Sequence, residues 1–237
     1  MLNPRNVRIS HIILQTRNVY EAAFRLRSET GLGFYDGGYL GTTATKIFPL
    51  GAGAYIQMTG SVDPFAALEP TTAEAAKRAF QNLKDGDRFG NIFLETETME
   101  DMEEIAKIRG ETTTDNRPSG NVPVGGRLQV NGQRVHTASI TQTKPLPRGT
   151  PGLNHFFDKM AHPSGQPVEP FPGLIRPLGV AWIEMGASEA EVSKAIGFSI
   201  AHLPFKYNAG KPGMYSFAVR TDKGEIVVKR NSSADAV

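Results

Sequence analysis

The stretch I-S-H-I-I-L-Q-T, residues 9–16, decides the fold, because this β-branched and apolar run is typical of a buried strand. Asn18 follows it as a candidate helix N-cap, with Glu21 three residues later in a pattern that resembles a capping box. A helix is therefore expected to run from there to Gly31, where glycine can adopt the left-handed C-cap conformation. The runs 46–48 and 54–58, joined by Gly51-Ala52-Gly53, then predict a hairpin.

The same order of strand, cap, helix, glycine and hairpin recurs twice further along the chain. The second pass begins at Asn91 and continues through a helix from Thr98 to Gly110. It contains Asn131-Gly132, the strongest hairpin signal in the sequence. The third pass starts at Val180 and has its helix start at Ser188. Because self-similarity of this kind marks a repeat architecture, the sequence predicts an α+β fold built from repeated βαβββ units.

The repeat also divides the chain into segments. We expect a first βαβββ unit at 1–69, a second at 70–143 preceded by a connecting helix, and a third, shorter βαββ unit at 179–230. The segment 144–178 between the second and third units contains 8 of the 16 prolines, which keeps regular structure brief. Its apolar side chains need burial, so a wrapped connection is favoured over a free linker. The polar residues 231–237 are expected to form a flexible tail.

The composition narrows the function. With 39% hydrophobic residues and 21% charged residues, the chain can bury a substantial core. The net charge of +2 gives no reason to expect a nucleic acid or a membrane surface as partner. The absence of cysteine excludes disulfides, thiolate nucleophiles and cysteine-ligated metal sites. No signal peptide or long apolar stretch is evident, so a soluble, cytoplasmic location is expected.

The order of several motifs gives the sequence a resemblance to a known family. They are Ser10-His11-Ile12-Ile13-Leu14, Gly37-Gly38 with Gly41-Thr42, Pro49-Leu50-Gly51 with Ala54-Tyr55-Ile56-Gln57, Arg117-Pro118-Ser119-Gly120, and His162-Pro163. In this order they resemble the glyoxalase-like proteins of the vicinal oxygen chelate superfamily over nearly the whole chain. The resemblance implies curled mixed sheets around a central cavity.

The resemblance also implies where a metal would bind, because ligands in this family come from the first and last strands of each unit. The first unit offers His11 and Gln57. When the caps and turns of the two units are aligned, Asn91 corresponds to His11 and His136 corresponds to Gln57. The predicted metal ligands are therefore His11, Gln57 and His136, a set that suits zinc, iron(II), manganese or nickel.

The sequence also departs from the family pattern. A glutamate is usual where Gln57 stands, and an amide contributes no negative charge to a metal site. In the third unit the corresponding positions are Ala181 and Val228, which cannot bind a metal. The third unit is therefore interpreted as structural or as a lid.

The implied function is that of a small-molecule enzyme in which a divalent metal polarises vicinal oxygens of an organic substrate, in lyase, isomerase, hydrolase or dioxygenase chemistry. The predicted catalytic residues are His11, Gln57, His136 and Arg117. The predicted substrate-binding residues are Phe34, Tyr39, Phe48, Asn91, Phe93 and His155. The alternative is a metal-free small-molecule binding protein, or an acid–base enzyme that uses a histidine, with the same fold. A homodimer is the expected assembly.

Some of these residues also have a simpler interpretation. A lone histidine on an apolar strand, such as His11, is otherwise a hydrogen-bonded core residue. If residues 154–162 were helical, His155, Asp158 and His162 would share one face. A short turn ended by Pro163, with Phe156 and Phe157 anchored inward, is favoured over that helix.

Overall fold

The computed structural model describes residues 6–40, 43–61, 88–116, 129–130, 133–141, 150–168 and 172–229. The first repeat forms β1 (Val7–Thr16), α1 (Val19–Thr30), β2 (Tyr35–Leu40), β3 (Thr43–Gly51) and β4 (Ala54–Ser61). The second forms β5 (Arg88–Thr96), α3 (Met99–Arg109), β6 (Thr112–Asn116), β9 (Thr137–Thr141) and β10 (Gly152–Phe156). These strands make one eight-stranded sheet in the order β2-β3-β4-β1-β5-β10-β9-β6. The predicted α+β fold of repeated βαβββ units is confirmed.

The helix boundaries lie where the sequence predicted them. The Asn18 side chain accepts hydrogen bonds from two backbone amides at the start of α1, and Gly31 ends the helix in the left-handed conformation, with φ of 73°. Thr98 and Gly110 have the same roles for α3. Ser188 and Glu191 form a reciprocal capping box at the start of α4 (Glu189–Ile196). These caps satisfy backbone groups that a helix end would otherwise leave unpaired.

The second repeat differs from the prediction at its closing strand. The residues on either side of Asn131-Gly132 do pair as strands, β7 (Gln129–Val130) and β8 (Gln133–Arg134), but these strands form a separate two-stranded sheet. The strand that lies parallel to β5 is β10, inside the segment 144–178 that was predicted to be a connection. In the first repeat β4 lies parallel to β1 in the same way. The connecting helix predicted before the second unit falls outside the described residues.

The third repeat forms a sheet of its own. Its elements are β11 (Pro177–Gly186), α4, β12 (Phe205–Asn208), β13 (Met214–Thr221) and β14 (Gly224–Lys229). The strand order is β12-β11-β13-β14, so β11 pairs in parallel with the first strand after the helix rather than with the last. The third unit therefore has the same order of strands and helix along the chain as the first unit, but its strands pair in a different order within the sheet. It contains a fourth strand, β12, that the sequence did not predict.

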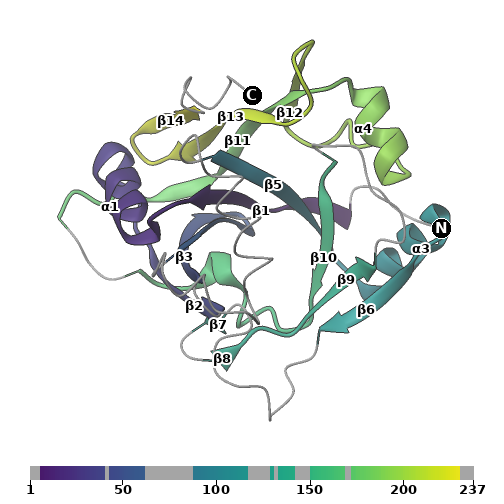
Figure 1. The fold of residues 1–237 in the computed structure, drawn as a ribbon, viewed down its shortest axis with the longest axis horizontal. Helices are drawn as coiled ribbons and strands as arrows, with labels where there is room; N and C mark the ends of the chain where they lie inside the picture. The colour runs from purple at the N-terminus through teal and green to yellow at the C-terminus, as the bar shows by residue number, and fades with distance from the viewer. Residues whose placement is uncertain are drawn as a thin grey trace.

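The two sheets pack through one hydrophobic core. Ile12 and Ile92, from the two central strands of the large sheet, share this core with Ile183 and Phe217 of the small sheet. In Figure 1 the small sheet lies along one side of the curved large sheet, with α1 and α3 toward its two ends. Side chains alternate across a strand, so His11 and Ile13 point to the opposite face from Ile12. That opposite face lines the cavity described below.

Among the helices that the structure describes, none has the length and apolar character needed to cross a membrane.

Candidate functional site

A pocket of about 310 Å³ lies on the inner face of the large sheet and takes side chains from both βαβββ units. It is lined by His11, Ile13, Tyr55, Gln57, Phe93, Asn116, Val135, Thr137, Asn154 and Phe156. None of these lining residues carries a carboxylate, an ammonium or a guanidinium group. None comes from the third unit, so that unit is not a lid over this pocket. The volume lies at the lower end of the range for small-molecule sites.

His11 lies in the wall of this pocket between two aromatic rings. Its ring centroid is 4.7 Å from that of Tyr55 and 4.6 Å from that of Phe93, and both pairs are stacked. The strand register explains this, because His11 pairs with Tyr55 on β4 and with Phe93 on β5. Burial, together with the nearby charge of His162, lowers the pKa of His11 to about 3, although Glu95 acts in the opposite direction. The imidazole is therefore neutral at physiological pH.

The hydrogen bonds of His11 leave one ring nitrogen for a ligand. Nδ1 lies 3.0 Å from the Ser10 hydroxyl oxygen. Nε2 has no partner among the described residues, and it donates or accepts according to the tautomer that the Ser10 bond selects. The side-chain amides of Gln57 and Asn154 also line the pocket and also lack partners within the described parts of the chain. The site thus presents neutral hydrogen-bonding groups between apolar walls.

A buried ion-pair network lies beside the pocket. Glu95 is fully buried, and its carboxylate accepts hydrogen bonds from Arg8 at 3.0 Å, Lys159 at 2.9 Å and His162 at 2.9 Å. Burial by itself would raise the pKa of Glu95, but the bonds to His162 and Lys159 and the charges of His162 and Arg8 lower it to about 2. The network ties the segment after β10 to the central strands.

The network connects to the pocket through aromatic contacts. The His162 ring lies 4.5 Å from that of Phe156 and 5.9 Å from that of Tyr55, both of which line the pocket. The Tyr55 hydroxyl is buried and has no hydrogen-bond partner in the part of the chain that the structure describes. Burial raises the pKa of Tyr55 well above its usual value, with further contributions from Tyr35 and Glu95, so the hydroxyl keeps its proton.

The structure places only some of the predicted site residues in the pocket. His11, Gln57 and Phe93 line it. Asn91 lies on β5 outside the lining, and its Oδ1 accepts a hydrogen bond from the Ile92 amide. Phe48 is completely buried in the hydrophobic core, and Phe34 packs against that core.

Two predicted histidines point away from the pocket. His136 contacts Asp115, with 2.6 Å between Nε2 and Oδ1, and stacks on Phe157 at 4.0 Å. His155 alternates with the pocket residues on β10, and its Nδ1 lies 3.0 Å from the Thr96 carbonyl oxygen. Arg117 and the Tyr39 side chain fall outside the described residues.

The segment after β10 is a turn, as the sequence favoured. Asp158 accepts hydrogen bonds from the Met160 and Ala161 amides, and no helix forms there. Phe156 is buried as expected, whereas Phe157 is 41% exposed, contrary to expectation. His162 reaches Glu95 instead of sharing a helix face with His155.

The pairing of the strands shows which residues occupy the positions of metal ligands. Ile12 pairs with Ile92 at the centre of the sheet, so an approximate two-fold axis relates β1 to β5 and His11 to Asn91. The same axis relates Ile13 to Phe93. Since Ile13 pairs with Gln57 and Phe93 pairs with Gly152, Gly152 corresponds to Gln57. The predicted correspondence of His136 to Gln57 is therefore wrong, because His136 precedes β9 rather than lying on the closing strand.

This donor set does not fit a resident divalent metal. The four corresponding positions hold an imidazole in His11, amides in Gln57 and Asn91, and no side chain in Gly152. First-row divalent ions are held by combinations of imidazole, thiolate and carboxylate, and no carboxylate stands at these positions. Glu95 is an acidic group near His11, and its oxygens are already occupied by three donors. Within the described residues, no group of three or more His, Asp and Glu side chains could hold a metal ion.

Several residues of the site were missed at the level of sequence. Asn154 lies in the proline-rich segment, where a strand was not expected, and L-N-H-F at residues 153–156 does not alternate apolar and polar residues, so it gives no clear strand signal. Glu95 gave no signal, because nothing in the spacing of the acidic residues distinguished it. Its three partners come from β1 and from the segment after β10, and only the folded chain brings them together.

The match to a family model agrees with this architecture. The family model described as the glyoxalase-like domain matches residues 9–167. Among solved structures, the chain is similar to a hypothetical protein from Staphylococcus aureus, with 13% identity, 95% of this chain and 87% of that chain covered, and a TM-score of 0.49. It is also similar to methylmalonyl-CoA epimerase from Mycobacterium tuberculosis, with 13% identity, 66% and 91% covered, and a TM-score of 0.41. A comparison with curated proteins gave no match.

Proposed function

The chain belongs to the glyoxalase-like domain family, and we propose that its pocket binds a small, uncharged organic molecule through hydrogen bonds, without a resident metal ion. The observation that carries this proposal is the chemistry of the lining. Three neutral polar groups, the His11 imidazole and the amides of Gln57 and Asn154, have no partner among the described residues, and no charged side chain from those residues lines the pocket.

The uncharged lining favours an uncharged ligand. Moving an ion out of water into a site without a counter-charge costs several kcal/mol, whereas a neutral polar group that finds hydrogen bonds loses little. The rings of Tyr55, His11 and Phe93 are stacked on one another. They favour a planar ligand, whose ring can stack on them or contact their edges. A molecule with both donor and acceptor groups would satisfy the two amides, since each amide offers both.

The state of His11 argues for binding rather than for proton abstraction. A general base works best when its pKa lies near the operating pH. The pKa of His11 is lowered to about 3, so this imidazole is a weak base. As a neutral group held by Ser10, it is suited to fixing the orientation of a ligand through Nε2. Of the two metal-free alternatives raised by the sequence, the binding protein is thus favoured over the acid–base enzyme.

The test compares three ligands of matched size, benzamide, benzoate and benzylamine, by isothermal titration calorimetry on the intact protein. Benzamide is expected to bind, and the two ions are expected to bind much more weakly. Gln57→Leu or Asn154→Leu should weaken benzamide binding about tenfold, because one hydrogen bond to the benzamide amide is lost and that group is left without a partner.

The matched control is Asn91→Leu, which removes an amide from the same sheet outside the pocket lining and should leave the affinity unchanged. Benzoate binding more tightly than benzamide would overturn the proposed ligand class. Tight binding of zinc or nickel that His11→Ala abolishes would overturn the proposed absence of a metal.

A further inference from the structure

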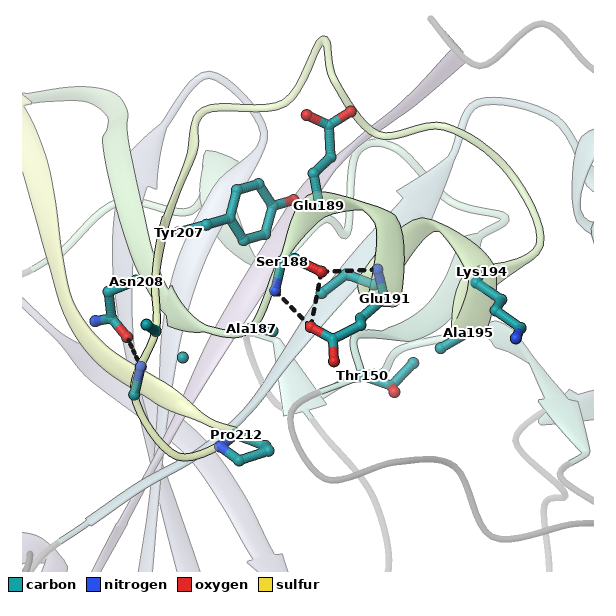
Figure 2. A pocket seen from close by; sticks show the side chains of 14 residues that line it. Thr150, Ala187, Ser188, Glu189, Glu191, Lys194, Ala195, Tyr207, Asn208 and Pro212 are labelled. Atoms are coloured by element: carbon teal, nitrogen blue, oxygen red, sulfur yellow. Dashed lines mark hydrogen bonds between the residues drawn. The ribbon is translucent and has the colours of Figure 1, made fainter.

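A second and larger cavity lies in the third unit, away from the pocket described above. Its volume is about 980 Å³, and it is bounded by the end of β11, the first turns of α4 and the loop between β12 and β13. Figure 2 shows the side chains that line it. They include Ala187, Val192, Ala195, Ala209 and Pro212, so much of the wall is apolar. A cavity of this size suits a small-molecule ligand.

The wall of this cavity is held in place by hydrogen bonds. Asn208 donates to Glu184 at 2.8 Å and accepts from the Gly210 amide at 2.8 Å. The Gly186 amide donates to the Gly213 carbonyl at 2.8 Å. The approach of the two backbones is so close that a Cβ on Gly186 would lie 2.0 Å from the Lys211 carbonyl oxygen. The loop is therefore fixed against β11, which keeps the cavity from closing.

The polar groups of the cavity fall into two sets. Ser188 and Glu191 satisfy each other and the first turn of α4, since the Glu191 carboxylate accepts from the Ser188 amide and hydroxyl (Figure 2). The start of the helix is thus already neutralised by a carboxylate, which disfavours an added anion. In contrast, the Tyr207 hydroxyl is buried and has no hydrogen-bond partner within the described ranges. Glu189 makes no ion pair with any residue that the structure describes.

Tyr207 and Glu189 both line the cavity, and the hydroxyl end of Tyr207 points toward Glu189 (Figure 2). Burial raises the pKa of Tyr207 to about 12, and the negative charge of Glu189 contributes to the rise. A carboxylate in the wall of a largely apolar cavity attracts an organic cation through direct charge pairing. Of the charged residues that line the cavity, Glu189 and Glu191 are acidic and only Lys194 is basic.

We propose that this cavity is a second ligand site that binds an amphipathic amine, with its ammonium group between Glu189 and Tyr207 and its apolar part against Ala187, Val192 and Pro212. The site is independent of the pocket on the large sheet, with which it shares no lining residue. The proposal therefore stands or falls separately from the proposed function of that pocket.

The test uses octylamine, octanoate and octanol, which share an apolar chain and differ in charge, in calorimetric titrations of the full chain below the critical micelle concentrations. Octylamine is expected to bind most tightly. Glu189→Gln should weaken octylamine about two- to fivefold, the range for a partly exposed charge pair, and should leave octanol unchanged. Glu103→Gln, an exposed change on α3, is the matched control and should have no effect.

A second variant tests the place of binding. Ala195→Phe fills the cavity from α4 and should abolish the binding of octylamine while benzamide binding to the first pocket is unchanged. Octanoate binding as tightly as octylamine would overturn the assignment of charge. Octylamine binding that survives Ala195→Phe would overturn the assignment of the site.

Discussion

Replacing His11 by phenylalanine should change how the stability of this protein depends on pH. Phenylalanine fits between Tyr55 and Phe93 as the imidazole does, but it cannot take up a proton. In the wild-type chain the pKa of His11 is lowered from 6.5 to about 3. Below pH 6.5 the unfolded chain therefore binds a proton at His11 while the folded chain does not. The folded state must lose stability as the pH falls from 6.5 toward 3.

The size of the effect follows from the same shift. Each pH unit in this window costs about 1.4 kcal/mol, so about 2 kcal/mol is lost between about pH 7 and about pH 5. Glu95 does not interfere there. Its pKa is lowered from 4.5 to about 2, so its stabilising contribution is complete above 4.5 and is lost only as the pH falls below that value. His11→Phe should remove the loss attributed to His11 and leave every other pH-dependent contribution in place.

The assay is urea denaturation of the wild type and of His11→Phe at several pH values between about pH 5 and about pH 7.5, with the difference in free energy of unfolding plotted against pH. That difference should shift by about 2 kcal/mol in favour of the variant at the acid end. Ile13→Val, a neutral change in the same pocket, is the control and should shift the curve by a constant. Parallel curves for the wild type and His11→Phe would refute the argument that burial keeps His11 neutral.

Two further predictions concern the same region. Glu95→Gln should lower the free energy of unfolding by roughly 3 kcal/mol in urea denaturation, because it leaves His162 and the ends of Arg8 and Lys159 without their counter-charge. An effect below about 1 kcal/mol would show that the network is not stabilising. The double variant Gly152→Glu with Phe93→Ile should gain affinity for zinc in calorimetry, whereas Phe93→Ile alone should not. Equal zinc affinities of the two variants would contradict the correspondence of position 152 to the ligand position of Gln57.

The sequence predicted well those features that depend on neighbouring residues. The caps at Asn18, Thr98 and Ser188 and the glycines that end the helices are local signals, because a side chain there bonds to a backbone group a few residues away. The closing strand of the second unit depends instead on pairing with β5, many residues earlier in the chain. The Asn131-Gly132 hairpin has the stronger local signal, and it drew the prediction away from Gly152–Phe156, where proline-rich flanks concealed a strand.

That one displaced strand accounts for the change in the predicted chemistry. With His136 on the closing strand, two imidazoles and an amide would converge on a metal. With β10 as the closing strand, the position holds Gly152, and a Cβ there would lie 2.4 Å from the ring of Phe93. A ligating side chain at 152 and the observed ring at 93 therefore exclude each other. The ring stacks on His11 and buries it, and that burial is the leading cause of its low pKa. Glycine at 152 and phenylalanine at 93 thus act together, replacing a chelating group by an aromatic wall and leaving His11 as a neutral hydrogen-bonding group.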